Sequence, residues 1–243
     1  MSVDRYIVVT GASRGLGLAV ARTLAEQGWG IVAASRTLSD PLERLIAGSA
    51  GRVSYRPLDL ADLQGHYRFA SELVAESGPP YGLVNNAAIA HDGILGTQHD
   101  SEIEAMIGVN VTGTILLTKY LSRAMLRRRR GRIVNVSSII ASTGFNGLSV
   151  YAATKAAMIG FTRSLARELG PANITVNAVA PGYMDTEMSA DLRESELGKI
   201  VRRSALNRLT TVEEVAAAIG FLISDAASAI TGTVTTVDAG ATA

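Results

Sequence analysis

The stretch YIVVTGASRGLGLAVARTLAEQG, residues 6–28, carries the pattern from which the fold of this 243-residue chain can be read. Its first five residues, 6–10, are apolar and mostly β-branched, as in a buried parallel strand. A glycine-rich loop follows, and residues 18–27 have helical spacing that ends at Gly28. Strand, loop and helix in this order predict the first βα unit of a parallel sheet.

Strands and helices continue to alternate along the chain. Further strands are expected at residues 29–35, 53–58, 81–86, 133–136, 174–179 and 234–237. Helical patterns cover residues 41–47, 61–77, 112–129, 151–169, 185–203 and 212–224. Because helical crossovers between parallel strands are right-handed, this alternation predicts one α/β domain over residues 1–243, with helices on both faces of its sheet.

Composition limits the classes of function. A hydrophobic share of 47% fits a well-filled core, and a formal net charge of +1 argues against a nucleic-acid-binding surface. No apolar run is long enough to span a membrane, and the first strand follows Met1 so closely that we expect no signal peptide. The absence of cysteine excludes disulfides and thiol catalysis, and it is compatible with the cytoplasmic location that we expect. The three histidines show no paired ligand spacing, so we expect no metal site.

The loop after the first strand has the pattern Gly-x-x-x-Gly-x-Gly, formed by Gly11, Gly15 and Gly17. Glycine permits a tight turn and close approach of the backbone, and the following helix N-terminus offers free N–H groups to an anion. A plain glycine-rich βα turn would contain the same residues. The strand–loop–helix context favours a nucleotide phosphate site.

A second stretch, residues 138–155, combines groups that suit proton transfer. Ser138 follows a strand-like run, Tyr151 opens a helical segment, and Lys155 lies four residues later on the same helix face. A free phenol has a pKa of about 10, and a nearby ammonium should lower it. Such a site could pass a proton to or from an alcohol or ketone. The pattern Tyr-x-x-x-Lys alone often occurs by chance, so this hypothesis depends on the other motifs.

Taken together, the motifs resemble those of the classical short-chain dehydrogenases/reductases, in order and spacing, over nearly the whole chain. They are TGASRGLG at 10–17, NNA at 85–87, Asn110, Ser138, Tyr151 with Lys155, and Pro181-Gly182. The resemblance implies a Rossmann-like, doubly wound parallel sheet of about seven strands in a single α/β domain. It also implies a nicotinamide cofactor across the carboxyl edge of the sheet.

The resemblance implies a role for each matching residue. Tyr151 resembles the family's general acid/base, and Lys155 resembles the residue that binds the nicotinamide ribose and lowers the tyrosine pKa. Ser138, rather than Ser137, resembles the serine that holds the substrate carbonyl. Asn110 resembles an asparagine that anchors a water in the proton relay, although a helix-interior asparagine bonded to its own backbone is an alternative. The implied cofactor contacts are Gly11, Ser13, Arg14, Gly15, Leu16, Gly17, Ser35, Arg36, Asp59, Leu60, Asn86, Ala87, Ala88, Tyr151, Lys155, Pro181, Gly182 and Thr186. Ala88 departs from the glycine that is common in the family.

The end of the second expected strand indicates NADP(H). An NAD-selective member would be expected to place a carboxylate there, bonded to the ribose diol. This chain has Ser35 and Arg36, and Arg14 lies in the glycine loop. Two guanidinium groups can pair with a 2′-phosphate. The alternatives are a solvated loop charge for Arg36 and a helix-start residue for Arg14.

The segments 151–168, 179–188 and 230–240 look most like those of 3-oxoacyl-[acyl-carrier-protein] reductases. The resemblance implies reduction of a 3-oxoacyl thioester, bound to a carrier protein or to CoA. The expected mouth of the site is apolar, with residues 185–203 as a lid, and is lined by Ile139, Ile140, Phe145, Met184 and Met188. Dehydrogenases of sugars, steroids and simple secondary alcohols share much of this sequence pattern. A non-catalytic NADP-binding regulator is a third alternative, disfavoured by the intact acid/base set.

The basic run at residues 127–130 ends an expected helix. It either interacts with the helix dipole and solvent or docks an acidic acyl carrier protein. Residues 171–173 offer no second basic group, which weakens the docking interpretation. The resemblance also implies a homotetramer, a dimer of dimers, in which helices 112–129 and 151–169 pair through small residues. These are Ala152, Ala156, Ala157 and Gly160, for which an intramolecular core contact is the alternative.

Overall fold

The computed structural model describes residues 5–184 and 194–243, and it contains one seven-stranded parallel sheet in the order β3-β2-β1-β4-β5-β6-β7. The strands are β1 (Tyr6–Thr10), β2 (Gly30–Ser35), β3 (Val53–Pro57), β4 (Gly82–Asn85), β5 (Gly131–Val136), β6 (Ile174–Pro181) and β7 (Val234–Val237). This is the doubly wound, Rossmann-like sheet that the sequence predicts. Thr186 and Met188, to which the sequence assigns roles, lie outside the described residues.

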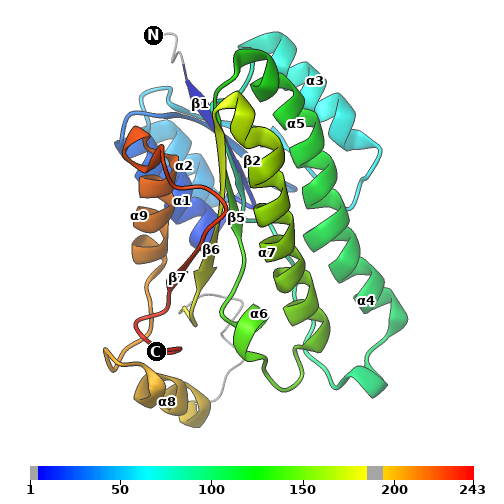
Figure 1. Cartoon of the computed structure of the whole chain (residues 1–243), viewed down its shortest axis with the longest axis vertical. Helices are drawn as coiled ribbons and strands as arrows, with labels where there is room; N and C mark the ends of the chain where they lie inside the picture. The colour runs from blue at the N-terminus through cyan, green and yellow to red at the C-terminus, as the bar shows by residue number, and fades with distance from the viewer. Residues whose placement is uncertain (1–4, 185–193) are drawn as a thin grey trace.

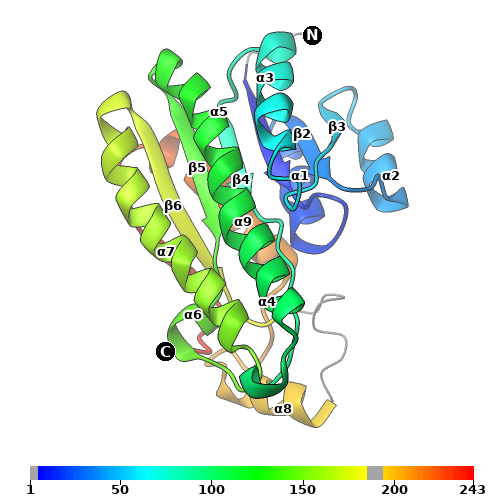
Figure 2. The ribbon, with the colours of Figure 1, turned by 90° about the vertical axis from the view of Figure 1, so that its right-hand side faces the viewer.

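Helices cover both faces of the sheet (Figures 1 and 2). They are α1 (Gly15–Glu26), α2 (Asp40–Gly48), α3 (Gly65–Ser77), α4 (Asp100–Ile107), α5 (Thr114–Arg128), α6 (Ile140–Thr143), α7 (Ser149–Leu169), α8 (Glu194–Arg203) and α9 (Val212–Ile223). Figure 2 shows α3, α5 and α7 on one face, and α1 and α9 lie on the other. The fold therefore has three layers, with the sheet between two layers of helices.

Strand β1 shows how the sheet separates two apolar cores. Ile7 and Val9 are buried on the face covered by α1 and α9. Tyr6 and Val8 are buried on the face covered by α3, α5 and α7. Successive side chains of a strand point to opposite faces, so a strand covered on both sides is apolar at every position.

The chain order creates a crevice at the carboxyl edge of the sheet. β1 lies between β2 and β4. The connection after β1 leads to β2 and the connection after β4 leads to β5, so the two run in opposite directions across the sheet. Ligands of open α/β sheets bind at this switch point, outside the carboxyl ends of the strands. In Figure 1 this edge faces the bottom of the view, where α6 and α8 lie.

The structure corrects the expected helix at residues 112–129. Helical backbone begins at Asp100 and runs through α4, a π-helical segment η2 (Gly108–Gly113) and α5. Two glycines and two valines within η2 weaken the helical signal. Gly113 also packs tightly, because a Cβ there would lie 2.2 Å from the Leu60 carbonyl oxygen.

The third helix also begins later than expected, at Gly65 rather than at residue 61. The Asp59 carboxylate accepts a hydrogen bond from the Ala61 N–H at 2.9 Å. The Asp62 carboxylate does the same for the Gln64 and Gly65 N–H groups, at 3.2 and 3.1 Å. These side chains offer the backbone a turn in place of the first helical residues. Of the expected helix at 185–203, the structure describes only α8.

Candidate active site

The glycine loop between β1 and α1 forms a cradle that side chains would fill. Gly11 has a positive φ of 67°, and a Cβ there would lie 2.8 Å from the Ala87 Cα. A Cβ on Gly17 would lie 2.1 Å from the Gly11 carbonyl oxygen. The first turn of α1 holds no acidic side chain. Open backbone and a helix N-terminus without opposing charge fit the phosphates of a dinucleotide.

Thr10 ties this loop to the end of β4. Its hydroxyl donates to the Val84 carbonyl oxygen at 3.2 Å and accepts from the N–H groups of Asn86 and Ala87 at 3.0 and 3.1 Å. The Asn86 amide in turn donates to the Thr10 carbonyl oxygen at 3.0 Å. Two expected cofactor contacts, Asn86 and Ala87, therefore lie against the glycine loop. The motif at 10–17 includes Thr10 but predicts no contact for its side chain, although a polar residue closing an apolar strand was a usable signal.

The loop after β2 is joined to the glycine loop by Ser39, another residue that sequence reasoning missed. The Ser39 hydroxyl donates to the Ser13 carbonyl oxygen, while Ser39 also caps α2. Arg14 and Arg36 are both exposed, one in each of these joined loops. Ser35 is 7% exposed, and its hydroxyl donates to the Thr37 carbonyl oxygen at 2.9 Å. The two arginines therefore lie on adjoining loops at the carboxyl ends of β1 and β2.

Other expected cofactor contacts also lie at the carboxyl edge. Asp59 is exposed just after β3, and Leu60 next to it is buried. Gly182 follows β6 and is closely packed, since a Cβ there would lie 2.7 Å from the Asp238 Cβ. The Pro181 carbonyl oxygen accepts from the Ile139 N–H at 3.0 Å, which joins this segment to the end of β5. Residues far apart in the sequence therefore line one edge.

Helix α7 brings Tyr151 and Lys155 to this edge. Lys155 is 4% exposed, and its ammonium donates to the Val136 carbonyl oxygen at 3.0 Å. The same ammonium lies 5.6 Å from the centre of the Tyr151 ring. The two residues share one helix face, as their spacing predicts.

The two serines after β5 have different surroundings. Ser137 is 2% exposed, and its hydroxyl donates to the Lys155 carbonyl oxygen at 2.8 Å, so it holds α7 against the sheet. Ser138 is half-buried, and its hydroxyl oxygen accepts from the Ile140 N–H at 3.2 Å. The Ser138 O–H remains a donor for a substrate oxygen at the carboxyl edge.

The expected lowering of the tyrosine pKa is wrong for this structure. Burial raises the pKa of Tyr151 to about 12, and the neighbouring Tyr183 adds to the increase. Burial lowers the pKa of Lys155 to about 8. The largest cause of both shifts is the same: removal of water disfavours the charged form of each group.

Asn110 lies in the π-helical segment η2 and is 3% exposed. Its side-chain oxygen accepts from the Ile89 N–H at 2.9 Å, and its side-chain nitrogen donates to the Ile89 carbonyl oxygen at 2.8 Å. The same nitrogen donates to the Thr154 hydroxyl at 3.1 Å. The alternative in which Asn110 bonds its own backbone is therefore wrong, because its amide joins η2 to the loop after β4 and to α7.

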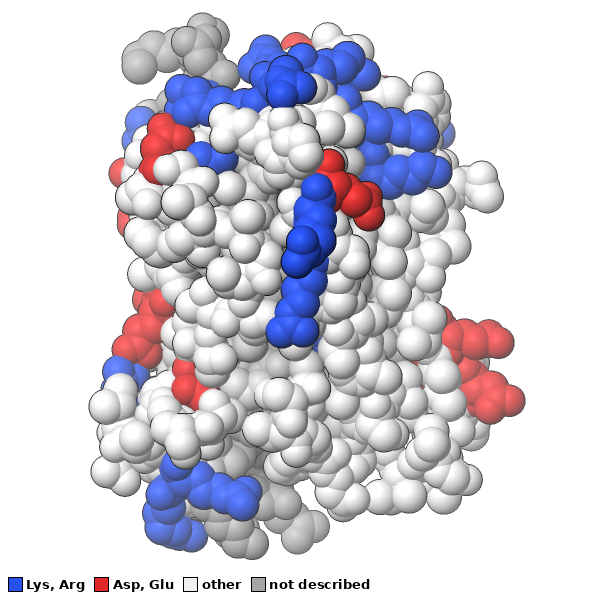
Figure 3. Space-filling view, viewed as in Figure 1, with Lys and Arg blue, Asp and Glu red and all other residues white. Residues whose placement is uncertain are grey.

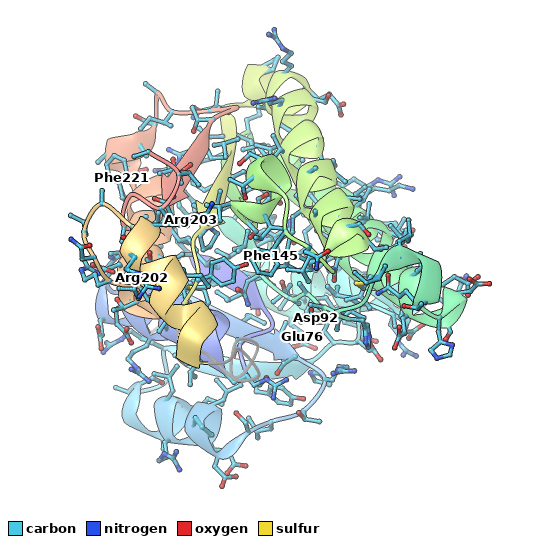
Figure 4. The ribbon with its side chains drawn as sticks, turned by 90° about the horizontal axis from the view of Figure 1, so that it is seen from below. Glu76, Asp92, Phe145, Arg202, Arg203 and Phe221 are labelled. Carbon is cyan, nitrogen blue, oxygen red and sulfur yellow. The ribbon has the colours of Figure 1, made fainter. Side chains whose placement is uncertain are left out.

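The exposed apolar surface at this edge differs from the expected set. Ile139 and Ile140 are each 5% exposed, whereas Phe145 is 43% exposed. The Phe145 ring meets the Tyr183 ring edge to face, with centroids 5.8 Å apart. In Figure 4, Phe145 lies between α8, which carries Arg202 and Arg203, and the loop with Asp92. That loop adds Ile94 and Leu95, each 57% exposed.

No group of three or more histidines, cysteines, aspartates or glutamates within residues 5–184 and 194–243 is placed to hold a metal ion. Nor does any helix in those ranges combine the length and apolar character that crossing a membrane requires.

Comparison with known proteins identifies the family. A family model described as enoyl-(acyl carrier protein) reductase matches residues 11–242. Nodulation protein G of Rhizobium sp. (strain N33) is 39% identical over 228 residues, which cover 94% of this chain and 93% of the relative. The 3-oxoacyl-[acyl-carrier-protein] reductase of Escherichia coli is 36% identical over 230 residues, with the same two coverages. That of Pseudomonas aeruginosa is 36% identical over 238 residues, 97% of this chain and 96% of the relative. The chain therefore belongs to the short-chain dehydrogenase/reductase family.

Proposed function

We propose that this protein reduces the keto group of a 3-oxoacyl thioester with NADPH in the cytoplasm. Membership of the family implies an oxidoreductase with a nicotinamide cofactor. When bound, the cofactor supplies the hydride. Tyr151 gives its phenolic proton to the ketone oxygen, Ser138 donates a hydrogen bond to that oxygen, and Lys155 binds the nicotinamide ribose.

The preference for NADPH rests on the two loops that Ser39 joins. Arg14 is exposed at the N-cap of α1 and Arg36 is exposed directly after β2, and the buried Ser35 stands where an NAD-selective member would be expected to place an acid. Guanidinium groups bind phosphate oxygens in a planar, bidentate manner. A 2′-phosphate on the adenine ribose is the group that these side chains suit.

The single observation that carries the substrate proposal is the apolar mouth. Phe145 exposes a ring next to the carboxyl edge, and Ile94 and Leu95 expose aliphatic side chains on a neighbouring loop. That loop is held to the segment after Phe145 by the Gly93 N–H, which donates to the Gly147 carbonyl oxygen at 2.9 Å. Exposed apolar side chains gain by covering an acyl chain and gain nothing from the hydroxyls of a sugar.

The proposed carrier-protein dock requires a second copy of the chain. Arg127 and Arg128 end α5 at the amino end of the sheet, where Figure 3 shows Lys and Arg side chains gathered at the top of the view. Tyr151 lies at the other end of the sheet, in the first turn of α7, a helix of 21 residues. At 1.5 Å per residue, α7 alone separates the two ends by about 30 Å. A carrier bound at residues 127–130 is therefore remote from the site of the same protomer.

We propose a homotetramer, a dimer of dimers, that resolves this separation. Ala156 and Gly160 are exposed on α7, and Leu126 is 40% exposed on α5. Two copies related by a twofold axis perpendicular to these helices would place them antiparallel. The basic end of one protomer would then lie beside the catalytic edge of its partner, where an acidic acyl carrier protein could reach both.

The test is NADPH oxidation by the purified protein against matched substrates. Acetoacetyl-CoA and an acetoacetyl carrier protein should be reduced, with kcat/KM well above that for acetone, a 3-keto steroid or a ketose sugar. NADH at the same concentration controls for cofactor choice. Brisk reduction of a sugar, a steroid or a simple ketone, with every 3-oxoacyl thioester inert, would replace the substrate proposal. NADPH binding without turnover of any carbonyl compound would favour a binding regulator.

A further inference from the structure

Thr154 is buried between the two parts of the candidate site. Its side chain is fully buried, and it precedes Lys155 on α7. Its hydroxyl donates to the Tyr151 carbonyl oxygen at 2.8 Å and accepts from the Asn110 side-chain nitrogen at 3.1 Å. One hydroxyl thus joins the turn that carries Tyr151 to the π-helical segment that carries Asn110.

These bonds fix which way the Asn110 amide points. Because the Thr154 hydroxyl donates its only proton to the Tyr151 carbonyl oxygen, it can only accept from the Asn110 side chain. The amide must therefore present its nitrogen to α7 and its oxygen to the Ile89 N–H, 2.9 Å away. The Ile89 carbonyl oxygen receives the second N–H of the same amide at 2.8 Å.

Ile89 lies on the loop whose first residues, Asn86 and Ala87, contact the glycine loop. A continuous set of hydrogen bonds therefore runs from this loop through Asn110 and Thr154 to the backbone of Tyr151. We propose that Thr154 is a positioning residue for the reaction: through Asn110, it fixes the loop after β4 relative to the Tyr151 turn. This inference rests on the proposed reductase activity for its kinetic test, though not for its structural one.

The same helix offers a matched control. Thr162 is fully buried on α7, donates to the Met158 carbonyl oxygen at 2.7 Å and accepts from the Asn135 side-chain nitrogen at 2.8 Å. Thr162 therefore has a hydrogen-bond pattern like that of Thr154, and it lies two helical turns further from the carboxyl edge. Asn135 lies within β5, and its side-chain oxygen accepts from the side-chain nitrogen of Asn85, the last residue of β4, at 2.8 Å. The control bond therefore joins α7 to the strands of the sheet and not to Ile89.

The experiment compares Thr154→Val, Thr154→Ser and Thr162→Val. Valine keeps the shape and removes the hydroxyl, whereas serine keeps the hydroxyl. Hydrogen exchange of the Ile89 amide, followed in the full-length protein, reports directly on the Asn110 bond. We expect Thr154→Val to accelerate this exchange about tenfold, the loss of roughly one hydrogen bond. Thr154→Ser and Thr162→Val should leave it unchanged, even if Thr162→Val lowers the melting temperature.

A double-mutant cycle separates positioning from general stability. If Thr154 acts through Asn110, adding Thr154→Val to Asn110→Ala should accelerate Ile89 exchange no further. In turnover assays, normalised to NADPH-binding sites, Thr154→Val should lower kcat about tenfold with little change in the KM for NADPH. Thr162→Val should keep kcat within about twofold.

Three results would overturn the proposal. They are unchanged Ile89 exchange in Thr154→Val, equal acceleration in Thr162→Val, and fully additive effects with Asn110→Ala. A wild-type protein that reduces no carbonyl compound would instead overturn the proposed function. The exchange measurements would still decide the positioning role in that case.

Discussion

The Lys155 ammonium donates a hydrogen bond to the Val136 carbonyl oxygen, 3.0 Å away, and is otherwise enclosed. This carbonyl is the last of β5, so the cation lies at the carboxyl edge beside the phenol of Tyr151. Burial lowers the pKa of Lys155 to about 8 and raises that of Tyr151 to about 12. At neutral pH the phenol of Tyr151 is therefore uncharged and Lys155 is mainly an ammonium. In this protonation state the phenol can act as an acid.

Replacing the phenol should separate chemistry from binding. Tyr151→Phe removes the proton donor but leaves Lys155 and the glycine loop in place. We expect turnover to fall by roughly 10²-fold or more, with NADPH affinity nearly unchanged. Steady-state rates and fluorescence titration of NADPH measure the two effects. Tyr183→Phe, which removes the neighbouring phenol, is the control and should cost much less. Near-normal activity in pure Tyr151→Phe would exclude the mechanism.

The buried lysine should give stability a characteristic pH dependence. Its pKa is about 8 in the folded protein and 10.5 in its ordinary state, so the unfolded chain binds more protons between these values. Folding stability then rises with pH across that window, and the cost of burying the charge is complete below pH 8.

Lys155→Met removes this cost and keeps an unbranched side chain that is one heavy atom shorter. The apo variant should be more stable than wild type at pH 7, by about 3 kcal/mol before the lost hydrogen bond to Val136 is subtracted. The difference should shrink by pH 9.5. Urea unfolding at fixed protein concentration measures both. A stability difference that does not vary with pH would show that Lys155 titrates normally in the folded state.

Two glycine-to-alanine substitutions, one in the glycine loop and one in α2, should have opposite effects on the protein. Gly17→Ala places a methyl group 2.1 Å from the Gly11 carbonyl oxygen, so the loop must move. We expect loss of NADPH binding of at least about tenfold, because the phosphate site depends on that loop. Gly48→Ala, in α2, meets no atom within 4 Å and should stabilise by up to about 1 kcal/mol. Isothermal titration and thermal unfolding test the pair, and tight binding by Gly17→Ala would refute the cradle.

Much of this architecture is readable from local pattern. β1, the glycine loop and α7 follow from apolar runs, glycine spacing and helical periodicity, which are properties of neighbouring residues. The π-helical segment at Gly108–Gly113 is not, because its backbone is fixed by the Asn110 bonds to Ile89 and Thr154, partners 21 and 44 residues away. The bond from Ser39 to Ser13, 26 residues away, was not predicted for the same reason.

The pKa values show a second limit of sequence reasoning. The i, i+4 spacing correctly predicts that Tyr151 and Lys155 are neighbours, yet it carries no information on burial. Once α7 packs against β5, desolvation dominates both groups. Spacing predicts proximity, whereas the sign of a pKa shift depends on the whole packed environment.

Arg36 should determine the choice of cofactor. Arg36→Asp replaces a phosphate partner with a carboxylate that can bond a ribose diol and repels a phosphate. A charge-assisted bond is worth about 1.5–3 kcal/mol, so NADPH affinity should fall roughly 10–100-fold while NADH improves. Arg44→Asp, an exposed arginine on α2, applies the same charge change outside the loop. The assignment fails if wild type already prefers NADH, or if Arg44→Asp shifts the preference equally.

Arg129 tests the carrier dock and the assembly together. Its guanidinium donates to the Pro171 carbonyl oxygen at 2.7 Å, at the amino end of the sheet. If this end binds an acidic carrier, Arg129→Glu should raise the KM for an acetoacetyl carrier protein and leave that for acetoacetyl-CoA nearly unchanged. Arg52→Glu reverses a charge at the distant β3 end of the same edge and serves as the control. Equal effects on both substrates would remove the docking role.

Mixed oligomers show which protomer the dock serves. A protomer with Tyr151→Phe has no acid but keeps Arg129, whereas one with Arg129→Glu keeps its catalytic residues. If the carrier bound at one protomer delivers its acyl group to the partner, the mixture should recover the wild-type KM for the carrier substrate at up to about half the sites. Each of the two homo-oligomers, measured separately, should not show the wild-type KM together with activity. A mixture that keeps the raised KM of Arg129→Glu would place dock and catalysis on the same protomer, which the separation of about 30 Å along α7 makes difficult to satisfy.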